Sequence, residues 1–130
     1  MKIVVTGGAG FIGSNVVDAF VSLGHQVLVI DDFSTGQREN LNAKAELVQA
    51  DIRSEQAAKA VTAFAPDVVD LHAAQIDVRR SVTEPRFDAD VNVGGLLNIL
   101  EAARKAGNLK RAIYAASGGS MYGDTQQIPT

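Results

Sequence analysis

Short apolar runs alternate with amphipathic stretches along the chain. Residues 3–5 are β-formers that glycines cut off, which is typical of a strand buried on both faces. Further runs that predict strands occupy residues 27–30, 46–50, 67–71 and 110–116. The pattern therefore predicts about five strands.

Between these runs, apolar residues recur at steps of three and four, which predicts helices. The first helix covers residues 11–23, and Gly24 is placed to end it as a left-handed cap. Ser54 caps a second helix, which Pro66 cannot continue. A third, long helix starts with proline in its first turn and covers residues 85–106.

Two segments lack a clear period. Residues 76–83 are expected to be irregular or a short helix, and the chain from Ser117 onward is expected to be a glycine-rich loop. Phe64 and Phe87 are expected to lie in the core.

Alternating strands and helices predict an α/β fold, a doubly wound parallel sheet with helices on both faces. Ligands bind beyond the carboxyl ends of such strands, near the switch point of the strand order. That rule gathers five segments at one edge of the sheet: residues 7–13, 31, 51, 72–75 and 117–119.

The turn between the first strand and the first helix contains Gly7, Gly10 and Gly13. In a dinucleotide-binding turn, glycines allow a tight bend, a close approach to a pyrophosphate and close packing of helix on strand. Asp31 follows about 20 residues after the turn, where such folds place the carboxylate that grips the adenosine ribose. The alternative is an ordinary tight loop with a solvated acid, but the strand, turn, helix, strand and acid in order favour a dinucleotide site.

Composition narrows the class of protein. The 130 residues predict one domain, with 46% hydrophobic and 21% charged residues and a net charge of −3 that favours neither nucleic acid nor an anionic membrane as partner. The chain has no cysteine and two histidines, so we expect no metal site and no disulfide. The apolar N-terminal run is too short for a signal segment and no run reaches membrane-spanning length, which predicts a cytoplasmic protein.

With these residues identified, the sequence resembles the extended short-chain dehydrogenase/reductase family. Within that family it is similar to the NAD-dependent nucleotide-sugar epimerases of the UDP-glucose 4-epimerase type. The matching stretches are spaced along the chain as in the family: TGGAGFIGS at 6–14, DDFSTG at 31–36, DIR at 51–53, HAAQ at 72–75, VNVG at 91–94 and ASGGSMYG at 116–123.

The resemblance implies NAD as cofactor and assigns roles to the matching positions. The glycine turn would lie against the pyrophosphate, Asp31 would hold the adenosine ribose, and Asp51 and Ile52 would flank the adenine. Ser117 would be the catalytic hydroxyl that hydrogen-bonds the sugar. The implied cofactor-binding residues are Gly7, Gly10, Phe11, Ile12, Gly13, Asp31, Asp32, Ser34, Thr35, Gly36, Asp51, Ile52, His72, Ala73, Ala74, Gln75 and Asn92.

The charges after the second strand favour NAD over NADP. Asp31 and Asp32 place negative charge where a 2′-phosphate would sit, and like charges at that range repel. Arg38 is the only nearby cation in the sequence that could compensate.

The departure from the family concerns the catalytic base, a tyrosine followed four residues later by a lysine. Tyr114 and Tyr122 are followed at that spacing by Gly118 and Gln126, so neither forms the pair. We therefore expect residues 1–130 to be the NAD(H)-binding Rossmann part of an epimerase, inactive alone and without the part that holds the nucleotide sugar.

Three alternatives remain open at this point. The chain could be an active minimal enzyme that uses Tyr122 or a base from another chain. It could be a subunit completed by a separate C-terminal polypeptide, or the cofactor half of a nucleotide-sugar dehydratase or reductase. Because the fifth strand and the flank of the long helix should be uncovered, we also expect a homodimer or larger assembly.

Overall fold

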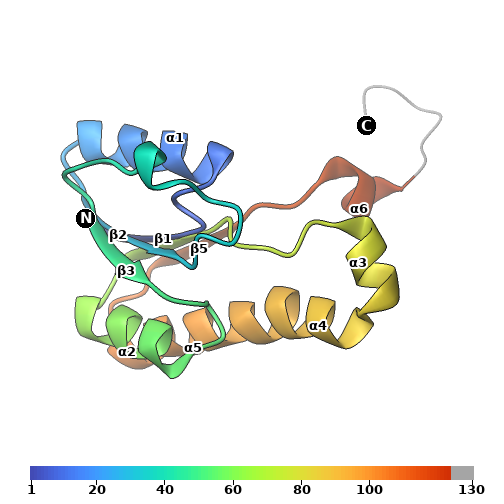
Figure 1. The fold of residues 1–130 in the computed structure, drawn as a ribbon. Helices are drawn as coiled ribbons and strands as arrows, with labels where there is room; N and C mark the ends of the chain where they lie inside the picture. Colours follow the sequence, from blue (N-terminus) through green and yellow to red (C-terminus); the bar gives the residue numbers. More distant parts are fainter. Residues whose placement is uncertain (124–130) are drawn as a thin grey trace.

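The computed structural model of the protein describes residues 1–123 as a five-stranded parallel sheet with helices on both faces (Figure 1). The strands are β1 (Lys2–Thr6), β2 (Gln26–Asp31), β3 (Glu46–Gln49), β4 (Val68–Leu71) and β5 (Arg111–Tyr114). Their order is β3-β2-β1-β4-β5. β2 and β3 are added on one side of β1 and β4 and β5 on the other, so the strand order switches between the neighbours β1 and β4. The predicted α/β class and doubly wound sheet are confirmed.

The helices fall into two layers and a group beyond the strand ends. They are α1 (Phe11–Ser22), η1 (Arg38–Asn40), α2 (Glu55–Phe64), α3 (Val78–Thr83), α4 (Pro85–Ala89), the π-helix η2 (Asp90–Gly95), α5 (Leu96–Ala106) and α6 (Gly118–Tyr122). In Figure 1, α1 covers one face of the sheet, α2 and α5 cover the other, and α3 and α6 lie beyond the sheet. The glycine turn connects the end of β1 to the start of α1, so it lies at the carboxyl ends of the strands.

Alternate residues of each strand point to opposite faces of the sheet. Helices cover both faces, so the residues on both faces are apolar. Val5 and Val29 pack with Val17 of α1. Val4 and Val69 belong to the other cluster, with buried residues of α2 and α5. This double burial explains why the central strands read as continuous apolar runs.

The predicted helix ends are confirmed. Gly24 follows α1 with a φ of +79°, and the hydroxyl of Ser54 accepts a 3.1 Å hydrogen bond from the Ala57 amide at the start of α2. α2 ends at Phe64, before Pro66, and Phe64 packs against the core. Residues 76–83, for which two outcomes were open, contain α3, whose start is capped by Asp77.

The expectation of one long third helix is wrong in part. The segment consists of α4, the π-helix η2 and α5 in succession. Gly94 and Gly95 weaken α-helical preference here. Gly95 also lies directly on Ile52, since a Cβ on Gly95 would be 2.5 Å from the Ile52 Cδ1. Close backbone approach to a buried side chain is a tertiary contact that periodicity does not reveal.

Two further expectations are wrong. The segment after Ser117 is not all loop, because residues 118–122 form α6, with the Met121 amide donating to the Ser117 carbonyl at 3.1 Å. Phe87 is half-buried rather than in the core, since its ring faces the guanidinium groups of Arg80 at 3.7 Å and Arg53 at 5.0 Å. The rest of the expected loop, residues 124–130, lies outside the described residues.

Within residues 1–123 no further strand covers the outer edge of the fifth strand, as expected. β5 forms one edge of the sheet and all four of its residues are exposed, with Tyr114 at 60%. On the long helical segment, Val93 and Leu97 are 55% and 54% exposed. None of the helices in residues 1–123 is long and apolar enough to cross a membrane.

Candidate nucleotide-binding site

The glycine turn is packed so closely that two of its positions admit no side chain. Gly7 has a φ of +69°, and a Cβ on it would lie 2.7 Å from the amide nitrogen of Ala73 at the end of β4. A Cβ on Gly13 would lie 2.2 Å from the Gly7 carbonyl oxygen. The turn is therefore held between the first turn of α1 and the chain that leaves β4.

The N-terminus of α1 presents backbone amides without a capping side chain among the described residues. Gly10 is the N-cap residue, and Phe11 and Ile12, at 85% and 62% exposure, stand at the helix start. Unpaired amides and the positive end of the helix dipole favour an anion at such a position. The arrangement suits a phosphate group.

Asp31 links the turn to the end of β2. Its side chain is buried; Oδ2 accepts a 2.9 Å hydrogen bond from the Ala9 amide, and Oδ1 accepts one of 2.8 Å from the Phe33 amide. An ionised carboxylate has about four acceptor sites, so two remain for a ligand hydroxyl. The expected adenosine-binding acid thus also stabilises the glycine turn through the Ala9 amide, a structural role that the sequence analysis did not predict.

The segment after Asp31 folds over this carboxylate. A Cβ on Gly36 would lie 2.9 Å from Asp31 Oδ1, while Asp32, Ser34 and Thr35 are exposed at the rim. Arg38 does not compensate their charge directly. Its guanidinium lies 4.5 Å from the centre of the Phe33 ring and donates to Gln49.

The side chains of Asp51 and Ile52, which follow β3, have different surroundings. The Asp51 carboxylate accepts hydrogen bonds from the guanidinium and the amide of Arg53, and this guanidinium holds the pKa of Asp51 below its usual value. The Ile52 side chain is buried in the core beneath Gly95. Arg53 was not expected at the site, although its charge two residues after Asp51 was a visible signal.

The chain leaving β4 brings residues 73–75 beside the turn. The Ala73 amide donates to the Thr6 hydroxyl at 3.2 Å. Asn92 of η2 pairs with the backbone of Gln75 in both directions: its Oδ1 accepts from the Gln75 amide at 2.8 Å, and its Nδ2 donates to the Gln75 carbonyl at 3.0 Å. Asn92, implied as a cofactor-binding residue, therefore supports this segment through the Gln75 backbone.

Ser117 follows the carboxyl end of β5 and its side chain is exposed. Tyr122, in α6, is also exposed, at 63%. Ser117 thus shares the strand-end edge with the glycine turn and Asp31, which agrees with the placement inferred from the alternation of strands.

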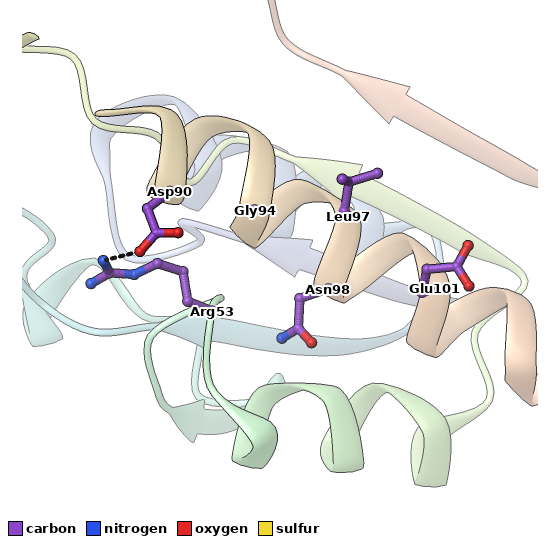
Figure 2. A pocket seen from close by; sticks show the side chains of 6 residues that line it. All are labelled: Arg53, Asp90, Gly94, Leu97, Asn98 and Glu101. Carbon is purple, nitrogen blue, oxygen red and sulfur yellow. Dashed lines mark ion pairs between the residues drawn. The ribbon is translucent and has the colours of Figure 1, made fainter. Parts of the chain in front are cut away.

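A separate hollow lies along η2 and α5, lined by Arg53, Asp90, Gly94, Leu97, Asn98 and Glu101 (Figure 2). Arg53 and Asp90 meet at one end of it at 3.7 Å. Asn98 points to the start of α2, where its Nδ2 donates to the carbonyls of Ile52 and Ser54. Arg53 is shared with the nucleotide site, but neither the glycine turn nor Asp31 lines this hollow.

Metal ligation was not expected, and within residues 1–123 no group of three His, Asp or Glu side chains is arranged to hold a metal ion.

An ionisable pair lies beneath the strand ends. His72 Nε2 is 3.0 Å from Asp70 Oδ1, and both side chains are largely buried. Neither atom has a hydrogen bond of good geometry within the described part of the chain. Burial raises the pKa of Asp70 above its ordinary value of 3.8, although His72 opposes this.

Asp70→Asn is expected to remove a pH-dependent loss of stability. A raised pKa means that the folded chain binds this proton more tightly than the unfolded chain, so its contribution is complete below pH 3.8 and is lost as the pH rises through the folded-state pKa. The substituted chain should therefore exceed the original in unfolding free energy at neutral pH, and the difference should shrink as the pH falls. Urea unfolding between pH 3.5 and 7 measures this, and a difference that is constant with pH would contradict it.

Comparison with known proteins shows what the chain is similar to. The model of the NAD dependent epimerase/dehydratase family matches residues 3–130. The chain is 45% identical over 135 residues to the UDP-glucose 4-epimerase of Mycolicibacterium smegmatis. The aligned region covers 100% of this chain and 43% of that protein.

Solved structures give the same picture. The UDP-glucose 4-epimerase of Thermotoga maritima with UDP-glucose matches with a TM-score of 0.91 at 40% identity, over 100% of this chain and 42% of that one. The UDP-glucose 4-epimerase of Thermus thermophilus in complex with NAD matches with a TM-score of 0.89 at 40% identity, over 96% and 40%. The chain therefore spans about two fifths of the length of these relatives.

Proposed function

The chain belongs to the NAD dependent epimerase/dehydratase family, and we propose that within this family it is the NAD(H)-binding portion of a nucleotide-sugar epimerase of the UDP-glucose 4-epimerase type. The observation that carries the proposal is the cradle at the start of α1. Gly7 and Gly13 leave no room for a Cβ there, and no side chain of residues 1–123 caps the helix N-terminus. Such a surface fits a pyrophosphate drawn close to the backbone.

The two ends of NAD would be held by different elements. Gly10, Phe11 and Ile12 would hold the pyrophosphate, and Asp31 would accept from the hydroxyls of the adenosine ribose. Residues 73–75, braced by Asn92, would run beside the nicotinamide ribose. Bound NAD⁺ would supply a hydride acceptor next to the sugar.

The charge at the end of β2 supports NAD over NADP. Asp32 is exposed next to the buried Asp31, while Arg38 is directed to Phe33 and Gln49. A 2′-phosphate would therefore meet carboxylate charge with no cation turned toward it from the described residues of this loop.

The proposed role in catalysis is limited to one group. Ser117 would donate a hydrogen bond to the sugar hydroxyl that is oxidised. The proton acceptor of the family is a tyrosine with a lysine four residues later, and that pair does not occur in these 130 residues. We therefore expect cofactor binding without completed epimerisation.

The test combines calorimetry with an assay of UDP-galactose conversion to UDP-glucose in one preparation. We expect NAD⁺ to bind, NADP⁺ to bind at least tenfold more weakly, and no turnover. Turnover would overturn the proposal and favour an active minimal enzyme that uses Tyr122 or a base from another chain. Absence of NAD⁺ binding would overturn the nucleotide site itself.

We also propose that the chain associates as a homodimer or larger assembly. The exposed apolar side chains of Val93 and Leu97 lie on the long helical segment, and β5 has an outer edge that pairs with no other strand of the described part of the chain. Sedimentation at increasing concentration should show the mass of a dimer or more. A single monomeric species at high concentration would refute association.

A further inference from the structure

A carboxylate outside the expected site joins three of the segments around it. Asp88 lies in α4, and its Oδ1 alone accepts three hydrogen bonds. The donors are the Ser81 hydroxyl at 2.6 Å, Gln75 Nε2 at 3.1 Å and Asn92 Nδ2 at 3.2 Å. One oxygen thus connects α3, the chain after β4 and η2.

This oxygen fixes which way two amide side chains face. An ionised carboxylate only accepts hydrogen bonds, so Asn92 must turn its Nδ2 toward Asp88. Its Oδ1 is then directed to the Gln75 amide, at 2.8 Å. In the same way the Gln75 side chain turns its Nε2 to Asp88, which leaves its Oε1 to accept from the Asp77 amide at 2.7 Å.

The consequence is a backbone held in place from both sides. Asn92, which Asp88 orients, binds the amide and the carbonyl of Gln75, and the Gln75 side chain is bound by Asp88 together with the Asp77 backbone and the Ser81 hydroxyl. Residues 73–75 abut the glycine turn, because a Cβ on Gly7 would lie within 3 Å of the Ala73 nitrogen. The turn itself and Asp31 have their own hydrogen bonds, which do not involve Asp88.

We propose that Asp88 is a positioning residue that acts through Gln75 and Asn92 to hold residues 73–75 against the nicotinamide half of NAD. This inference rests on the proposed function, which places the nicotinamide ribose beside these residues. Asp88 itself does not contact the cofactor. The adenosine half, held by the glycine turn and Asp31, is independent of it.

The experiment compares two ligands on the same variants by calorimetry. NAD⁺ reaches residues 73–75, whereas ADP occupies only the adenosine and pyrophosphate part. Asp88→Ala should weaken NAD⁺ binding about tenfold, the effect of losing a hydrogen-bonded anchor, and leave ADP binding within about twofold of the original.

The conservative variant supplies a rescue. All three donors meet Oδ1, so the amide oxygen of Asp88→Asn can replace it, and NAD⁺ affinity should return to within about threefold of the original. Glu84→Ala is the matched control, because it removes a neighbouring carboxylate whose partner is Arg80. It should leave both affinities unchanged.

Each outcome decides the matter. Equal losses for NAD⁺ and ADP would mean that Asp88 only stabilises the fold, and unchanged NAD⁺ affinity in Asp88→Ala would mean that it positions nothing; either result overturns the inference and leaves the proposed function standing. If the original chain binds neither ligand, the proposed function fails and the inference with it. Should Asp88→Ala not fold, Asp88→Glu keeps the charge but displaces the oxygen, and the same selective loss is expected.

Discussion

Gly13→Ala is expected to abolish measurable NAD⁺ binding and to destabilise the fold. The added methyl group would stand 2.2 Å from the Gly7 carbonyl oxygen and 2.9 Å from the Gly7 carbonyl carbon, both backbone atoms that no rotamer change can move. α1 must then shift away from the turn, which separates its N-terminal amides from the end of β1. Overpacking of this kind costs about 1–3 kcal/mol, and the phosphate cradle is lost with it. Urea unfolding and calorimetry with NAD⁺ measure the two effects.

Gly94→Ala is the matched control for this prediction. Its Cβ would lie 3.4 Å from Asp90 Oδ1, an ordinary contact, and alanine favours helical structure. It should therefore leave the unfolding free energy unchanged or raise it, with NAD⁺ affinity intact. If Gly13→Ala bound NAD⁺ as tightly as Gly94→Ala, the close packing of α1 on the turn would not be needed for binding.

Asp31→Ala is expected to lower both stability and NAD⁺ affinity. The substitution leaves the buried Ala9 amide and the partly buried Phe33 amide without their acceptor. The loss at the buried Ala9 amide costs about 1–3 kcal/mol, and the loss at Phe33 adds to it. The glycine turn also loses its link to β2, and the adenosine ribose loses its acceptor. We expect at least a tenfold fall in NAD⁺ affinity, measured by calorimetry at a temperature where the variant is folded.

Asp77→Ala separates the effect of burial from that of the hydrogen bonds. The exposed Asp77 carboxylate also accepts from two backbone amides, those of Arg79 and Arg80, but water can replace it there. The loss of stability should therefore be about 1 kcal/mol or less. Equal losses for Asp31→Ala and Asp77→Ala would contradict the role assigned to the buried carboxylate.

The parts of the fold that the sequence predicted are those set by local pattern. The runs at β1, β2 and β4 are mostly apolar because both faces of these strands are buried, although β4 also contains the buried Asp70. The glycines before α1 mark a turn whose close backbone packing leaves no room for a Cβ at Gly7 or Gly13. Helix ends at Gly24 and Ser54 follow from capping, which is also local. Such features need no knowledge of distant residues.

The parts that were missed depend on contacts between segments far apart in the chain. The π-helix at η2 coincides with the contact of Gly95 on Ile52, and Phe87 leaves the core because two arginines from other elements flank its ring. For the site, the sequence pattern predicted Asp31 and the family resemblance implied Asn92, but neither identified the hydrogen-bond partners of these residues. The hydrogen bonds of Asp88 arise only when α3, α4 and the end of β4 meet, so periodicity could not identify it.

The roles of Ser117, Asp51 and Ile52 toward ligands stay predictions. Ser117 follows the strand end where a reacting group would be expected, whereas the buried Ile52 side chain leaves only its backbone to face an adenine.

The strand order has a consequence for the kinetics of folding. β1 is central and pairs on one side with β2, which follows it closely in sequence, and on the other with β4, which is distant. The β1–α1–β2 unit, with the glycine turn, can form early from local contacts, but the pairing of Val4 with Val69 requires closure of a long loop. During synthesis, the second edge of β1 must remain unpaired until β4 has emerged, and that interval is when this apolar strand is most exposed to misassembly.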